Sequence, residues 1–219
     1  MTNFIEFVIV RHGETADNAA GILQGQLDSP LNSLGEKQAQ CAAEALAEEH
    51  FDAAYSSDLR RALQTAGIVA ARHPALNISA RPALREWNLG DFEGMRQQEL
   101  LKEHIDILRG LRVEEEGESA VPHGENKTAF FQRIMSAMQS IADAHRSGDR
   151  ILLVTHGGAM QIIFRLALGG VKTGAIIPLP DNASISRVRF MPGKRCWQLY
   201  TWNERAHLNA AGVHNTLIF

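Results

Sequence analysis

Two short apolar runs, far apart in the chain, each end at a histidine followed by glycine. Residues 7–10 read Phe-Val-Ile-Val and precede Arg11, His12 and Gly13, and residues 150–155 read Arg-Ile-Leu-Leu-Val-Thr and precede His156 and Gly157. Continuous apolar runs of about four to eight residues are typical of parallel strands buried on both faces. Because such strands need helices on both faces of their sheet, the runs predict an α/β fold.

Helical and extended patterns alternate along the rest of the chain. We expect helices over residues 33–50, 58–73, 96–111, a stretch ending near 145, and 159–168. Ser33 and Glu36 have the spacing of a capping box, and Asp58 is predicted to cap the second helix. Further strands are expected at 53–56, at 78–84 and in a hairpin of 184–190 with 196–202. This order predicts a three-layer α/β/α domain over residues 1–219, with a mostly parallel central sheet.

Composition excludes several classes of function. The net charge of −3 argues against a nucleic-acid or anionic-membrane partner, since both favour a basic surface. Cys41 and Cys196 form no Cys-x-x-Cys pair, which disfavours a zinc site and fits a reducing cytoplasm. The apolar run at residues 4–10 is too short to span a membrane. A homodimer through the hairpin edge or an exposed helix is compatible with the sequence.

Four features carry residues suited to chemistry. His12 and His156 follow the carboxyl ends of strands, where ligands bind in open α/β sheets. An arginine at a helix N-terminus is disfavoured by the helix dipole, so Arg60-Arg61 indicates either a bound phosphate or a solvated basic face. Glu86, between an arginine and a tryptophan, would suit acid/base work if it is partly buried.

Together these motifs resemble the histidine phosphatase superfamily, also called the phosphoglycerate mutase-like family. The Val-Arg-His-Gly-Glu-Thr signature at residues 10–15 is followed, in the expected order and over nearly the whole chain, by Asn18, Gln24-Gly25, Arg61-Ala62, Glu86 and His156-Gly157. One departure is Asp17, where many members carry tryptophan.

The resemblance implies a role for each matching residue. His12 would attack phosphorus and become phosphohistidine, while Arg11, Arg61 and His156 would surround the transferring phosphoryl group. Glu86 would protonate the leaving oxygen. The substrate-binding positions implied are Asn18, Gln24, Gly25 and Gly157. No metal or other cofactor is implied, because arginines would neutralise the phosphate charge.

Two further positions, Arg60 and Glu125, are not assigned to the site. Arg60 corresponds to a variable position and is expected to point elsewhere. Glu125 matches a family Gly-Glu-Ser element, and it fits a helix N-terminal carboxylate as well as a substrate contact.

The resemblance therefore implies a phosphomonoester hydrolase that acts on small phosphorylated metabolites. Phosphoglycerate mutase-type transfer is the main alternative. Glutamates at positions 114, 115, 116 and 118 would repel a second anion and so favour hydrolysis. A non-catalytic phosphate-binding module is a minor alternative, because the five catalytic positions are all present.

Overall fold

The fold is built on one six-stranded sheet with the order β3-β2-β4-β1-β5-β6. The computed structural model describes residues 3–103, 121–169 and 177–213. The strands are β1 (Ile5–Arg11), β2 (Ala53–Ser56), β3 (Ile78–Ala80), β4 (Arg150–Thr155), β5 (Ile185–Met191) and β6 (Cys196–Glu204). The pairs β1–β4, β4–β2 and β2–β3 are parallel, whereas β5 is antiparallel to both β1 and β6. The predicted mostly parallel sheet with an antiparallel hairpin at one edge is confirmed.

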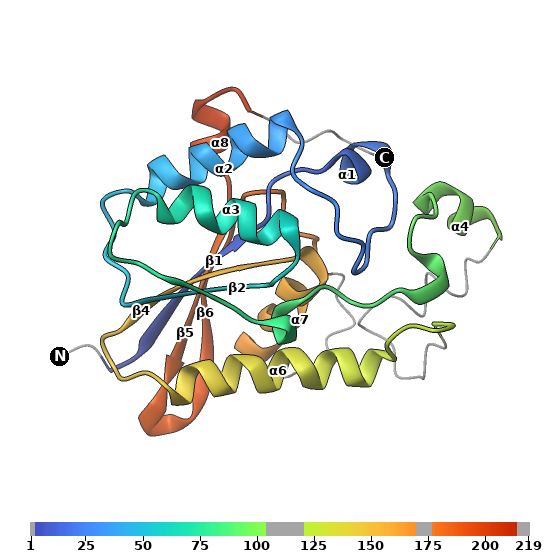
Figure 1. The fold of residues 1–219 in the computed structure, drawn as a ribbon. Helices are drawn as coiled ribbons and strands as arrows, with labels where there is room; N and C mark the ends of the chain where they lie inside the picture. Colours follow the sequence, from blue (N-terminus) through green and yellow to red (C-terminus); the bar gives the residue numbers. More distant parts are fainter. Residues whose placement is uncertain (1–2, 104–120, 170–176, 214–219) are drawn as a thin grey trace.

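Helices cover both faces of the sheet, which confirms the three-layer architecture (Figure 1). One face carries α2 (Ser33–Leu46), α3 (Arg60–Ala70) and α8 (Ala206–Ala210), and the other carries α6 (Lys127–Asp143) and α7 (Gly157–Ala167). The short helices are α1 (Ala16–Ala20) and α4 (Gln97–Glu103), with single 3₁₀ turns η1 (Pro82–Leu84), η2 (Gly90–Phe92) and η3 (Pro192–Lys194).

The central strands are buried on both sides. Along β1, Phe7 and Ile9 pack in the core beneath α6 and α7, while Val8 and Val10 pack in the core beneath α2 and α3. All four side chains are inaccessible to solvent. The two-residue period of a strand therefore places the continuous apolar run into two cores at once.

Several predicted boundaries were wrong. Asn32, not Ser33, caps α2, because its side-chain oxygen accepts the Gly35 N–H at 2.7 Å. Asp58 does not cap α3; Leu59 holds the cap position without a side-chain hydrogen bond. The helix predicted at 159–168 already begins at Gly157.

Other elements are shorter than expected. The first long helix ends at Leu46 and the strand at 78–84 ends at Ala80, where a 3₁₀ turn follows. Of the helix predicted at 96–111, α4 covers Gln97–Glu103, and the remainder lies outside the described residues. The glutamate cluster at 114–118 lies outside them too.

The topology places a switch point, where open α/β sheets form a crevice, at the carboxyl ends of β1 and β4. These two strands are neighbours, but the long helix that follows β1 (α2) lies on one face of the sheet, and the helix that follows β4 (α7) lies on the other. Such a switch point is where ligands bind in open α/β sheets. Among the described residues, no helix is both long and apolar enough to cross a membrane.

Candidate active site

The two predicted histidines meet at this crevice. Arg11 pairs in register with Thr155, and the backbone N–H of His12 donates to the carbonyl of Thr155 at 3.0 Å. The imidazole rings of His12 and His156 lie 5.1 Å apart between centroids. Because β1 and β4 end level with each other, residues 144 positions apart in sequence share one pocket.

The hydrogen bonds of His12 define its tautomer. Its Nδ1 lies 2.7 Å from the carbonyl oxygen of Gly13. Since a carbonyl oxygen can only accept, Nδ1 carries the proton and Nε2 keeps its lone pair. The side chain is buried, with 3% exposed. Burial, together with the charges of Arg61 and Arg11, holds the pKa of His12 well below its ordinary value. The ring is therefore a neutral base with a free nucleophilic nitrogen.

Arg61 is the buried member of the arginine pair. It is 1% exposed, and its Nε donates to Nδ1 of His156 at 3.2 Å. Its Nη1 and Nη2 donate to the carbonyls of Leu27 and Gly25 at 2.6 and 2.8 Å. Arg60, by contrast, has an exposed side chain, as expected. The helix-initial pair is thus divided between solvent and the pocket.

His156 is held on both ring nitrogens. Nδ1 accepts from Arg61, so the proton lies on Nε2, which donates to the Ser57 hydroxyl at 2.8 Å. Burial first, and then the charge of Arg61, keeps the pKa of His156 well below its ordinary value. Ser57 was not among the predicted site residues, although its position directly after β2, at the same edge of the sheet, could have indicated it.

Arg11 enters the pocket from the end of β1. Its Nη1 donates to the carbonyl of Pro180 at 2.5 Å, while its buried Nε has no hydrogen-bond partner among the described residues. A Cβ on Gly157 would lie 3.5 Å from the Arg11 guanidinium carbon, so the N-terminus of α7 adjoins this arginine. Burial lowers the pKa of Arg11 to about 10. Burial also lowers the pKa of Arg61.

Glu86 lies close enough to Arg11 and Arg61 for its charge to act on both guanidinium groups. The carboxylate oxygens accept from the backbone N–H groups of Trp87 at 2.9 Å and Gly158 at 2.8 Å. A Cβ at Gly158 would lie only 2.4 Å from Oε1 of Glu86, so the close approach of the acid to α7 needs glycine there.

Of the four predicted substrate-binding positions, Gly157 adjoins Arg11 as described above, and the other three have distinct surroundings. The Asn18 side-chain oxygen accepts from Thr15 N–H at 3.2 Å in a capping box, which directs its amide group away from the cap. Gln24 is buried, and its Oε1 has no partner among the described residues. Gly25 is left-handed (φ 51°) and holds Arg61 through its carbonyl.

Several contacts that support residues 12–17 were not predicted from the sequence. Asn182 donates to the carbonyl of His12 at 3.0 Å, and no sequence signal marks it. A Cβ on Gly13 would lie 2.3 Å from the Gly35 carbonyl oxygen, so the loop backbone packs directly on α2. The Asp17 carboxylate, the departure from the family pattern, accepts a hydrogen bond from Ser29.

Glu125 directly precedes Asn126, the N-cap of α6, which agrees with the reading as a helix N-terminal carboxylate. Its carboxylate forms a two-bond ion pair with Arg133 on α6, at 2.7 and 2.8 Å. The side chain therefore caps no helix and is engaged within the protein.

The chain is similar to known proteins over most of its length. The chain is 35% identical over 96% of its length to phosphoglycerate mutase-like protein 4 of Arabidopsis thaliana, covering 90% of that protein. It is 34% identical over 94% of its length to a metal-independent phosphoserine phosphatase of the same plant, covering 84% of that protein. A solved mycobacterial glucosyl-3-phosphoglycerate phosphatase, in complex with VO3, superposes with a TM-score of 0.77 at 30% identity, covering 90% of this chain and 98% of the other. The sequence model of the histidine phosphatase superfamily (branch 1) matches residues 7–205. The chain belongs to the histidine phosphatase superfamily.

Proposed function

We propose that this protein is a metal-independent phosphomonoester hydrolase that acts on small phosphorylated metabolites through a phosphohistidine at His12. The observation that carries the proposal is the Nδ1–H bond from His12 to the Gly13 carbonyl at 2.7 Å. It leaves Nε2 unprotonated beside two arginines, the half-buried Arg11 and the buried Arg61. A neutral imidazole among cations is suited to attack an anionic phosphoryl group.

The reaction proceeds in two displacements. In the first, Nε2 of His12 forms a bond to phosphorus as the ester P–O bond breaks, and protonated Glu86 gives its proton to the leaving oxygen. In the second, Glu86 accepts a proton from water as that water attacks phosphorus and the P–N bond breaks. Phosphate leaves, His12 is neutral again and Glu86 is protonated, so the cycle closes.

Charge supports an anion at this place. Arg11, Arg61, His12 and His156 lie close together, and burial and mutual repulsion lower the pKa of each histidine. A phosphoryl dianion would offset the positive charges of Arg11 and Arg61. Arg11, Arg61 and His156 would face its equatorial oxygens.

The remaining predicted contacts divide into two kinds. The amide groups of Asn18 and Gln24 and the N–H of Gly157 at the start of α7 act as direct phosphate donors. Gly25 acts through Arg61, which it orients by its carbonyl.

The names of the relatives support hydrolysis of small phosphate esters. Two of the relatives reported above are phosphatases of this kind, acting by name on phosphoserine and on glucosyl-3-phosphoglycerate. A third is named mutase-like, so transfer of the phosphoryl group to a second sugar acid is the alternative.

Rapid-quench labelling tests the proposal. The protein is mixed with ³²P-labelled substrate in EDTA, quenched in base, which preserves phosphohistidine, and counted. We expect a labelled protein that disappears in His12→Ala, whereas His50→Ala, whose side chain is 83% exposed, serves as the matched control. Label on His12→Ala, or activity that needs added metal, would contradict the proposal. Interconversion of 2- and 3-phosphoglycerate faster than phosphate release would establish the mutase alternative.

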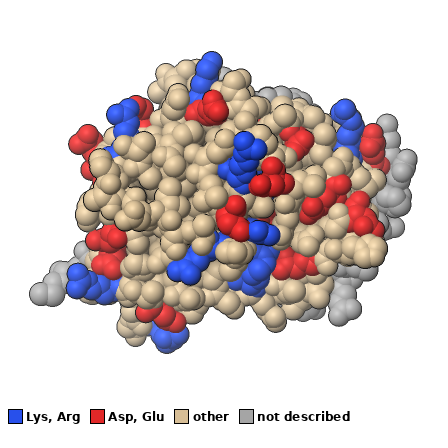
Figure 2. Space-filling view, in the orientation of Figure 1, with Lys and Arg blue, Asp and Glu red and all other residues tan. Residues whose placement is uncertain are grey.

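Further proposals concern the domain organisation, the compartment, the partner and the oligomeric state. We take residues 1–219 as one domain acting in the cytoplasm, where the two free thiols of Cys41 and Cys196 would be stable. On the face shown in Figure 2, acidic and basic side chains are interspersed, which agrees with a small-molecule partner in preference to nucleic acid. Light scattering of the purified protein tests for the homodimer.

A further inference from the structure

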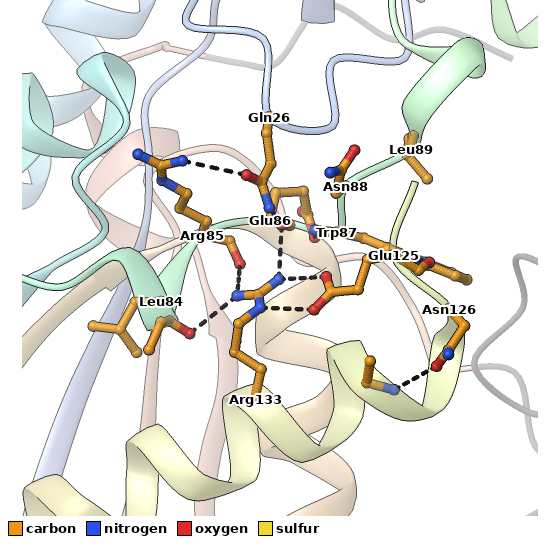
Figure 3. Close-up of polar contacts among 12 residues, drawn as sticks. Gln26, Leu84, Arg85, Glu86, Trp87, Asn88, Leu89, Glu125, Asn126 and Arg133 are labelled. Atoms are coloured by element: carbon orange, nitrogen blue, oxygen red, sulfur yellow. Dashed lines mark hydrogen bonds and ion pairs between the residues drawn. The ribbon is translucent and has the colours of Figure 1, made fainter. Parts of the chain in front are cut away.

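Residues 85–89, which carry Glu86, form no helix or strand. Backbone carbonyls in such a segment need partners from elsewhere in the protein. Three of the carbonyls around Glu86, those of Ala83, Arg85 and Glu86 itself, accept hydrogen bonds from one side chain, Arg133 of α6, at 3.0, 2.9 and 3.1 Å (Figure 3). The backbone around Glu86, the proposed acid, is therefore hydrogen-bonded to a side chain of α6.

The guanidinium of Arg133 is fully used. Its Nε and Nη2 donate to the two carboxylate oxygens of Glu125 at 2.8 and 2.7 Å, in addition to the three carbonyl bonds. An arginine has five N–H donors, and here each has an acceptor. The fork geometry of the Glu125 pair fixes the plane of the guanidinium, and that plane fixes where the three carbonyls lie. A lysine, with a point charge and three rotating donors, could not reproduce this set.

Glu125 is anchored in turn to the other side of the same segment. Its carbonyl accepts from Trp87 Nε1 at 2.6 Å, and its N–H donates to the Asn88 carbonyl at 2.9 Å. The rings of Trp87 and Phe130 stack with their centroids 5.5 Å apart and an angle of 18° between their planes. The guanidinium carbon of Arg133 lies over the Phe130 ring, 5.1 Å from its centroid. The segment around Glu86 is thus held on both sides by residues near the start of α6.

We propose that Arg133 and Glu125 form a positioning unit that holds Glu86 at the place where it exchanges protons with the leaving group and with water. This inference rests on the proposed function, because it needs Glu86 as the acid. Neither residue touches substrate; both act through the backbone of residues 83–88. Other groups fix the Glu86 side chain, namely the N–H of Trp87 and of Gly158, while the charges of Arg11 and Arg61 face it from β1 and α3.

The pairing also has an electrostatic consequence. An unpaired Arg133 would add a further positive charge to a pocket that already holds Arg11 and Arg61, and its charge reaches His156. The Glu125 carboxylate neutralises it. The unit can therefore supply three donors to the segment without adding a net positive charge beside Glu86.

A double-mutant cycle between Arg133 and Glu86 tests the inference. Protonation of the leaving oxygen matters greatly for an alkyl phosphate and little for 4-nitrophenyl phosphate, whose leaving group needs no proton. A misplacement of about 1 Å costs on the order of 10²-fold. We expect Arg133→Met to lower kcat on phosphoserine by about 10²-fold and on 4-nitrophenyl phosphate by less than about 10-fold. In a Glu86→Gln background, the same change should lower kcat on phosphoserine by less than about three-fold.

Controls separate positioning from loss of the fold. Arg146→Met removes an arginine whose side chain is 91% exposed, and it should leave both substrates unaffected. Arg133→Lys keeps the charge and loses the fork, so its rates should still depend on the leaving group. Circular dichroism and urea unfolding are recorded for every variant.

Each outcome has a defined meaning. Equal losses on both substrates, or equal losses with and without the Glu86 carboxyl, would overturn the positioning role. So would failure of both Arg133→Met and Arg133→Lys to fold, since the residue would then serve only the fold. If Glu86→Gln alone hydrolyses phosphoserine at the wild-type rate, the acid assignment in the proposed function fails, whatever Arg133 does.

Discussion

Replacing Gly158 by alanine adds one carbon atom beside Glu86, the proposed acid. A Cβ there would lie 2.4 Å from Oε1 of Glu86 and 3.1 Å from its carboxylate carbon. A carbon–oxygen contact is ordinarily about 3.3 Å or longer, so the oxygen must move by roughly 0.9 Å. The Gly158 N–H bond at 2.8 Å and the Trp87 N–H bond at 2.9 Å both depend on the present position. The carboxylate is the far end of a flexible side chain, so the change displaces the acid without forcing the backbone apart.

The expected loss follows from that displacement. A 1 Å error in a reacting group costs on the order of 10²-fold in rate, or about 2.7 kcal/mol at 1.36 kcal/mol per factor of ten. We expect this loss in kcat/KM for phosphoserine, a much smaller loss for 4-nitrophenyl phosphate, and a urea midpoint within error of the wild type. Gly67→Ala in α3 is the matched control, because its Cβ would meet nothing within 4 Å. A Gly158→Ala enzyme with wild-type kcat/KM on phosphoserine would refute the reasoning.

The remaining predictions concern charge and packing. The lowered pKa of His12 means that ¹⁵N NMR at pH 6 should still show a neutral ring protonated on Nδ1; a doubly protonated ring at that pH would contradict the assigned tautomer. Gly13→Ala should destabilise the protein by about 1–3 kcal/mol in urea unfolding, because its Cβ would meet the Gly35 carbonyl oxygen at 2.3 Å, and an unchanged midpoint would show that the loop can shift. The hydrogen bonds from Arg85 lower the pKa of Asp58, so this carboxylate stabilises the fold above the unfolded pKa of about 3.9 and ceases to do so as pH falls through the folded value. Asp58→Asn should therefore lower Tm more at pH 7 than at a pH below the folded pKa, and a difference that stays undiminished on acidification would rule out the charge as the cause.

The parts of the site that could be predicted from sequence lie where regular strands end. The apolar run before His12 and the one before His156 define buried strands, and parallel strands bring their carboxyl ends to one edge. The pair Arg60-Arg61 at a helix N-terminus indicated either a bound phosphate or a solvated basic face, and the family resemblance selected Arg61. For the two histidines a local pattern implied a position in space.

The parts that could not be predicted depend on side chains that cross between elements. Asp58 is a residue type that often caps helices, but Arg85 donates two hydrogen bonds of 2.6 Å to its carboxylate. Charged hydrogen bonds of this kind are stronger than one from a backbone N–H, so the side chain pairs with Arg85 and does not cap α3. Glu125 stands just before α6, yet it bonds to Arg133 eight residues later. Asn182 reaches the His12 carbonyl from 170 residues away. Nothing in the neighbouring residues of either partner encodes such contacts.

The central position of β1 bears on how the protein loses activity. This strand is hydrogen-bonded on both sides, to β4 and to β5, and the His12 amide continues the β4 ladder through Thr155. Its amide hydrogen can exchange with solvent only when β1 and β4 separate, which opens both cores together. The amide of His12, the proposed nucleophile, should therefore exchange only through global unfolding. Fraying at either edge of the sheet would leave the proposed reacting nitrogen in place, so activity and the whole fold should disappear in one cooperative step.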